Sequence, residues 1–117
     1  MKNLAQSILL MIGVMSVGSI AFSHSKVDTT NPANGAVLAE APASIDLTFG
    51  GKIRLTKVIL QREGQAPIHL DLSGYKRFEN SFSFPNPSED IGRYTIEWRG
   101  LGADGHVMQG TFTFTVE

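Results

Sequence analysis

The sequence predicts an all-β domain built as an antiparallel sandwich or barrel. Beyond residue 24, apolar and polar residues alternate with a period of two in several separate stretches, as in strands that bury one face. Turn-forming residues separate these stretches, and none of them has a convincing helical period. Several short strands with frequent turns are typical of sandwiches and barrels.

The alternation places the strands in order along the chain. In the first of them, Ile45, Leu47 and Phe49 alternate with polar residues. The predicted strands are 45–49, 58–61, 68–72, 82–84, 93–99 and 108–116. The predicted turns, rich in proline, asparagine or glycine, are 31–35, 62–65 and 85–87.

The first 23 residues have the pattern of a cleavable signal peptide. Lys2 supplies a positive charge, and the apolar run at 8–20 is shorter than the roughly 18–20 residues that a membrane span needs. Ala21-Phe22-Ser23 places small side chains three and one positions before a cut, as signal peptidase requires. We therefore expect a signal peptide at 1–23, a mature domain at 24–117 and export through a secretory pathway.

The composition excludes several classes of function. The net charge is −1, and the charged residues are scattered, without the basic patch of a nucleic-acid-binding protein. After cleavage we expect no direct membrane insertion, and a single monomeric domain. The chain has no cysteine, so no disulfide can stabilise it, whereas a bound metal ion could.

His24 is the first candidate ligand. Cleavage before it would release an α-amine with a pKa near 7.7–8.0. This amine and the imidazole Nδ1 can close a six-membered chelate ring around a cation. The first residue of a chain is also commonly free of any partner, so His24 alone fits both interpretations.

Asp104-Gly105-His106 is the second candidate. In extended backbone, residues two apart project to the same side, with Cα atoms roughly 6.5–7 Å apart, so one carboxylate and one imidazole can converge on an ion. Gly105 eases a turn between the strands at 93–99 and 108–116. An ordinary Asp-Gly turn with an incidental histidine fits the same residues.

Together His24, Asp104 and His106 offer an amine, two imidazoles and a carboxylate. This donor set suits the tetragonal nitrogen and oxygen site of copper(II), and we expect one Cu(II) per chain. Zinc could use the same donors. A blue-copper site needs a cysteine, and Met108, the single methionine after residue 24, is assigned to the core, so no dedicated Cu(I) site is expected.

Two other conspicuous residues receive structural interpretations. His69 is one of the polar residues that alternate with apolar ones at 68–72, and it is expected to face water. Trp98 shares the parity of Tyr94 and Ile96 and is expected in the core. No nucleophile elbow or phosphate-binding loop is visible, so no catalytic residue is predicted.

Several motifs occur together in the order of one known family. They are the leading His24, Pro32-Ala33-Asn34-Gly35-Ala36-Val37-Leu38, Ala41-Pro42, Leu47-Thr48-Phe49, Gly92-Arg93-Tyr94-Thr95-Ile96-Glu97-Trp98-Arg99, Ala103-Asp104-Gly105-His106, Gly110 and Phe112-Thr113-Phe114-Thr115-Val116. Over nearly all of 24–117 the chain resembles the CopC-type (CopC/YobA-like) copper-binding domain of the bacterial periplasm.

The resemblance implies a Greek-key β-sandwich or barrel, Ig-like or cupredoxin-like, of about seven strands. It implies a Cu(II) site at His24, Asp104 and His106, and the absence of a methionine cluster places the chain in a Cu(II)-only subtype. The chain departs from many members in two places. Gly50-Gly51 replaces an acidic pair near the metal, which could weaken the site, and Gly102 replaces a serine.

The expected function is that of a periplasmic copper(II) carrier or buffer in copper homeostasis and resistance, without catalysis. Its partners beyond the copper ion would be an inner-membrane copper transporter or a cuproenzyme. One alternative is a histidine-brace copper oxidase, although the domain is short and Asp104 would occupy an exchangeable position. Another is a metal-free β-sandwich interaction module.

Overall fold

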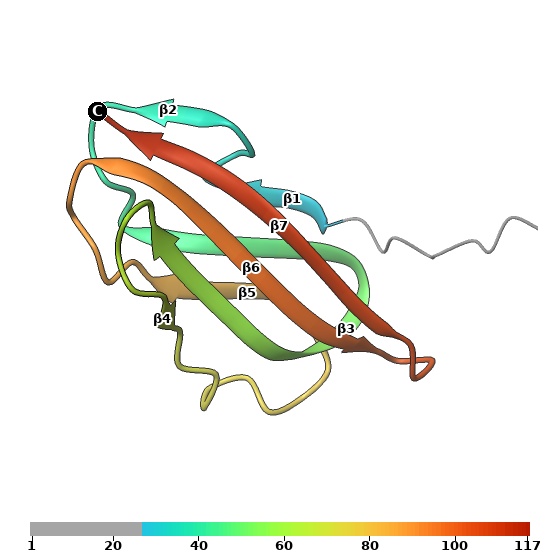
Figure 1. Ribbon diagram of the computed structural model, residues 1–117. Helices are drawn as coiled ribbons and strands as arrows, with labels where there is room; N and C mark the ends of the chain where they lie inside the picture. Colours follow the sequence, from blue (N-terminus) through green and yellow to red (C-terminus); the bar gives the residue numbers. More distant parts are fainter. Residues whose placement is uncertain (1–26) are drawn as a thin grey trace, which may run out of the picture.

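The computed structural model describes residues 27–117, which form seven strands and no helix. The all-β prediction is therefore confirmed for this part of the chain (Figure 1). The strands are β1 (Val27–Asn31), β2 (Ala36–Leu38), β3 (Ser44–Arg62), β4 (Ile68–His69), β5 (Glu79–Pro85), β6 (Gly92–Gly102) and β7 (Val107–Val116). Between residues 27 and 117, no helix of the length and apolarity of a membrane span occurs.

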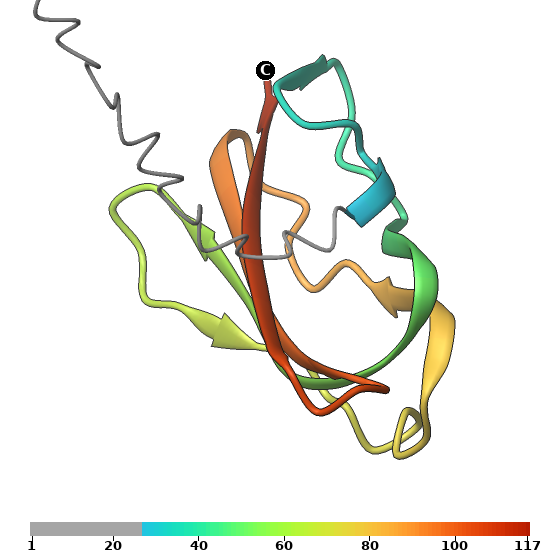
Figure 2. The ribbon, with the colours of Figure 1, turned by 90° about the vertical axis from the view of Figure 1, so that its right-hand side faces the viewer.

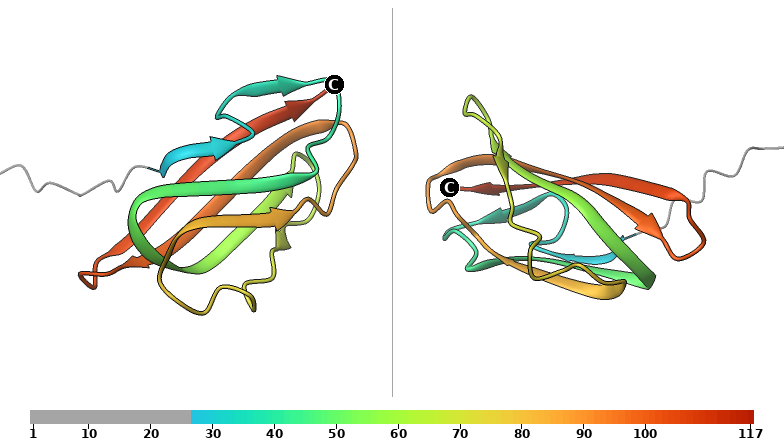
Figure 3. Two further views of the ribbon diagram at one scale, coloured as in Figure 1. Left: turned by 180° about the vertical axis from the view of Figure 1, so that it is seen from behind. Right: turned by 90° about the horizontal axis from the view of Figure 1, so that it is seen from below.

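The strands form one sheet, ordered β1-β3-β6-β7-β2, that curls into two facing layers. The first half of β3 pairs with β1 and β5, and its second half pairs with β4 and β6. Strand β3 thus passes from one layer to the other, as Figures 2 and 3 show. All pairings are antiparallel except that of β2 with β7, which is parallel.

The bend of β3 has two local causes. Residues 49–52, including Gly50 and Gly51, face the single residue Asn80 of β5, so the regular ladder is interrupted there. A second irregularity leaves Thr56 without a partner between two paired residues of β6. After this bulge the buried side chains of β3 have even instead of odd residue numbers. The predicted strands 45–49 and 58–61 both lie in β3 and are two parts of one strand.

Fifteen apolar or aromatic side chains form the core between the layers. Phe49 contacts the ring of Trp98 edge-on at 5.0 Å and thereby joins the two layers beneath the β6–β7 loop. Trp98 is 2% exposed, which confirms its predicted core position. The buried residues are Ile45, Leu47, Phe49, Ile53, Leu55, Val58, Leu60, Phe82, Phe84, Tyr94, Ile96, Trp98, Phe112, Phe114 and Val116.

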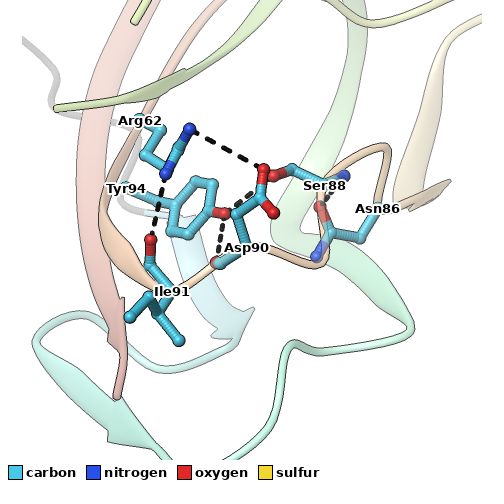
Figure 4. A network of polar contacts seen from close by, with 6 residues as sticks. All are labelled: Arg62, Asn86, Ser88, Asp90, Ile91 and Tyr94. Carbon is cyan, nitrogen blue, oxygen red and sulfur yellow. Dashed lines mark hydrogen bonds and ion pairs between the residues drawn. The ribbon is translucent and has the colours of Figure 1, made fainter. Parts of the chain in front are cut away.

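A network of polar contacts surrounds Tyr94 near the start of β6, at the end of the domain away from the β6–β7 loop (Figure 4). The Tyr94 hydroxyl donates to the Asp90 carbonyl at 2.5 Å and lies 2.8 Å from Ser88 Oγ. Arg62 donates to the Ile91 carbonyl at 3.2 Å. The Tyr94 hydroxyl is therefore paired, which avoids the cost of an unpaired buried polar group. The same contacts fix the connection from β5 to β6 to the rest of the domain.

The strand predicted at 68–72 is shorter than expected. Only Ile68 and His69 pair with β3, and Ile68 is 41% exposed. Leu70 and Leu72 still pack against the core. His69 is exposed, as predicted.

Gly110 makes room for the Trp98 indole. The two residues are direct partners across β6 and β7, and a Cβ on Gly110 would lie 2.7 Å from Trp98 Nε1. Because the backbone of both strands is fixed by the ladder, the indole would have to move.

We therefore expect Gly110→Ala to lower the free energy of unfolding by about 1–3 kcal/mol through overpacking. Gly51→Ala is the matched control, because no atom lies within 4 Å of its added Cβ and its backbone is not left-handed. The control should change stability by less than about 1 kcal/mol. Urea denaturation of both variants measures the difference, and equal losses would contradict the packing argument.

Candidate metal centre

The loop between β6 and β7 is a tight turn that places two metal-binding side chains side by side. The Gly102 carbonyl accepts the Gly105 N–H at 2.9 Å, and the Gly102 N–H donates to the His106 carbonyl at 2.8 Å. Gly105 has a φ of +87°, a conformation that glycine adopts without strain. This is the pattern of a three-residue hairpin loop with a bulged glycine. The predicted loop position of the motif is confirmed (Figure 1).

Asp104 and His106 contact each other through both carboxylate oxygens. Asp104 Oδ2 lies 2.7 Å from His106 Nδ1, and Asp104 Oδ1 accepts the His106 backbone N–H at 3.1 Å. The two side chains remain 65% and 74% exposed, respectively. The Asp-Gly turn is therefore also the feature that brings the two candidate ligands together.

This contact prepares the imidazole for a metal ion. An ionised carboxylate only accepts hydrogen bonds, so the proton of the neutral His106 ring resides on Nδ1, and Nε2 keeps a free lone pair. Histidine ligands in metal sites are commonly oriented by a carboxylate in this way. For Asp104 and Nε2 to bind the same ion, the carboxylate must leave Nδ1, because the two ring nitrogens point to nearly opposite sides of the imidazole.

The contact shifts the pKa of both groups. The hydrogen bond to Asp104, followed by its charge, raises the pKa of His106 above 6.5. The hydrogen bonds from the ring and the backbone N–H of His106 lower the pKa of Asp104 below 3.8. The ion pair consequently contributes to stability above pH 3.8 and below pH 6.5. Its contribution is lost as pH falls through the lowered pKa of Asp104 or rises through the raised pKa of His106.

A pocket of about 350 Å³ lies between this loop and the bend of β3. Its only carboxylate among the described residues is Asp104, because Gly50 and Gly51 contribute no side chain to the opposite wall. Phe49 forms part of the wall and pairs with Val27 of β1. The pocket is lined by Phe49, Gly50, Gly51, Lys52, Ile53, Gly102, Ala103, Asp104, His106 and Met108.

The predicted third ligand, His24, lies outside the described residues. Within residues 27–117, no three side chains of histidine, cysteine, aspartate or glutamate gather closely enough to hold a metal ion. The described part therefore brings together Asp104 and His106. His69, on β4, is not among the residues that line this pocket.

Sequence reasoning missed that Met108 lines this pocket. Met108 packs against the core, as predicted, but it is only partly buried and lines the pocket. A signal was present, because Asp104, His106 and Met108 have the same parity. Gly102 and the bend at Gly50-Gly51 were read as departures from a family pattern rather than as the pocket walls.

A family model described as the CopC domain matches residues 27–117. The chain belongs to the CopC family. The match covers all of the described strands, β1 to β7, and confirms the resemblance drawn from the motifs.

Two curated relatives extend over the whole chain. Copper resistance protein C of Pseudomonas syringae pv. tomato is 27% identical over an alignment of 124 positions that covers 98% of each chain. Copper resistance protein C of Escherichia coli is 25% identical over an alignment of 127 positions that covers the whole of both chains.

Solved structures of the family have the same fold. CopC from Methylosinus trichosporium OB3b superposes with a TM-score of 0.66 at 21% identity, covering 80% of this chain and 94% of that one. PcoC, a methionine-rich copper resistance protein from Escherichia coli, gives a TM-score of 0.54 at 22% identity, covering 80% and 99%. At these identities the likeness concerns the fold.

The pairing of Asp104 with His106 predicts a measurable titration. In an NMR pH titration of the metal-free protein, the His106 ring should titrate above pH 6.5. Asp104→Asn removes the charge and weakens the hydrogen bond, so it should lower the His106 pKa. An unchanged His106 pKa in the variant would show that the two side chains do not interact in solution.

Proposed function

We propose that this CopC-family chain is a periplasmic copper(II)-binding protein that acts as a carrier or buffer in copper homeostasis and resistance. It binds one Cu(II) per chain through His24, Asp104 and His106, and it has no catalytic activity of its own. The observation that carries the proposal is the Asp104–His106 pair, held 2.7 Å apart by the β6–β7 turn at the edge of a pocket. The names of the relatives, copper resistance protein C, agree with it.

The position of β1 supports His24 as the third ligand. Strand β1 begins at Val27, which pairs with Phe49 in the wall of the pocket. His24 precedes Val27 by three residues, and three extended residues span at most about 10–11 Å. In a chain cut after Ser23, the distance from Val27 to the pocket wall is therefore within reach of the free α-amine and the first imidazole.

The donor set favours Cu(II) over other ions. An amine, two imidazoles and a carboxylate supply three nitrogens and one oxygen, the tetragonal arrangement in which copper(II) is most stable among divalent ions. The chain contains no cysteine, so a thiolate cannot redirect the site towards zinc or blue copper.

The exposure of the site suits transfer of copper rather than catalysis. With 65% and 74% of their side chains exposed, Asp104 and His106 can be approached by the ligands of a partner. An incoming histidine or carboxylate could replace them one at a time. The partner would be an inner-membrane copper transporter or a cuproenzyme, met by the protein as a monomer.

The first prediction concerns composition and spectrum. Mass spectrometry of the exported protein, with copper added, should show a chain that begins at His24 and carries one copper ion. Its Cu(II) spectrum should be rich in nitrogen and lack an intense thiolate band. A different N-terminus, or no stoichiometric copper, would contradict the proposal.

The second prediction isolates the α-amine. One alanine added before His24 leaves every other side chain unchanged but converts the His24 nitrogen into an amide. Loss of this donor and of its chelate ring should weaken Cu(II) binding by about three orders of magnitude, or about 4 kcal/mol. Competition titration against a Cu(II) chelator measures the change.

His106→Ala should weaken binding similarly, whereas His69→Ala is the matched control and should leave the affinity unchanged. Circular dichroism of the metal-free variants must first show that they are folded. Equal Cu(II) affinity of the extended and native proteins would exclude the N-terminal chelate.

A further inference from the structure

The Met108 thioether and the Asp104 carboxylate meet over Gly102. A Cβ placed on Gly102 would lie 2.9 Å from Met108 Sδ and 2.7 Å from Asp104 Oδ1. The two atoms therefore border one small volume that the absent side chain leaves open. The same volume belongs to the pocket that His106 lines.

The placement of Met108 follows from the strand. It is the second residue of β7, two positions after His106, and pairs with Gly100 of β6. Its inward parity directs the side chain below the loop, where it packs partly against the core. The sulfur is thus carried by a paired strand rather than by the loop.

We propose that Met108 Sδ is an additional, soft ligand of the ion held by Asp104 and His106. The inference rests on the proposed copper-binding function. A thioether is a weak ligand of Cu(II), where methionine commonly takes a long axial position, and a much better ligand of Cu(I). Met108 accordingly contributes little to the binding of Cu(II) and strengthens the binding of Cu(I) at the same site.

Gly102 is part of this arrangement. Any larger residue would place its Cβ within 3 Å of both the sulfur and the carboxylate oxygen. One of the two would then have to turn away from the shared volume. The glycine at this position therefore leaves room for the oxygen and the sulfur together, and it does not serve backbone freedom, since Gly102 does not have a positive φ.

One thioether is not a methionine cluster. The site has nitrogen and oxygen as its other donors, which favour Cu(II). We therefore expect Cu(II) to remain the more tightly bound ion, with Met108 raising the reduction potential of the couple by stabilising its Cu(I) form.

Selenium labelling tests this directly. Met1, Met11 and Met15 all precede His24, so the exported, processed protein grown on selenomethionine would contain selenium only at residue 108. X-ray absorption at the copper edge of the Cu(I)-loaded protein should show a selenium neighbour at bonding distance. The signal should be absent from Met108→Leu, which retains the size and apolarity of the side chain.

Voltammetry supplies an independent readout. Met108→Leu should bind Cu(II) as the parent does but lose at least about tenfold in Cu(I) affinity, which lowers the one-electron potential by about 59 mV. Val107→Leu is the matched control, because Val107 is 69% exposed and does not line the pocket. Its potential should equal that of the parent.

The outcomes separate the two proposals. A Cu(I)-loaded protein without a selenium neighbour, or an unchanged potential in Met108→Leu, overturns the role of Met108 and leaves the copper(II) function standing. A parent protein that takes up no stoichiometric copper overturns both.

Discussion

The register of the β6–β7 hairpin is the constraint on which the rest of the structure depends. Ten paired positions, from Gly92 with Val116 to Leu101 with Val107, fix which side chains of both strands enter the core. The same register sets the length of the loop that connects them. Only a tight turn fits, and its geometry brings Asp104 and His106 within 2.7 Å. Core packing and ligand placement are therefore two results of one pairing.

Much of the fold could be predicted because burial of one strand face leaves a period of two in the sequence. The signal fails where the backbone departs from a regular ladder. The bulge at Thr56 reverses the parity of β3, so one strand of 19 residues was read as two. Strands β1 and β2 were not predicted, because Val27–Asn31 contains one apolar residue and Ala36–Leu38 is apolar throughout, so neither alternates. The parallel pairing of β2 with β7 could not be predicted either, because alternation of apolar and polar residues does not indicate which strands pair or in which direction.

The candidate site was predictable to the extent that its ligands are neighbours in sequence. The short spacing of Asp104 and His106 in extended backbone suffices to bring them together, and a glycine between them predicts the turn. The wall of the pocket could not be predicted, since it depends on how the bend at Gly50-Gly51 folds back on the loop. The shared parity of Asp104, His106 and Met108 can be seen in the sequence, but only the structure shows that Met108 Sδ and Asp104 Oδ1 both lie close to Gly102.

The central claim is that one copper(II) ion joins the N-terminal residue to the β6–β7 turn. Anomalous diffraction at the copper edge, from crystals of the copper-loaded exported protein, tests it most directly. The account predicts a single copper peak within bonding distance of Asp104, of His106 Nε2 and of both the α-amine and Nδ1 of His24. A peak at another place, for example on His69, or a copper ion at the turn without His24 bound, would contradict it.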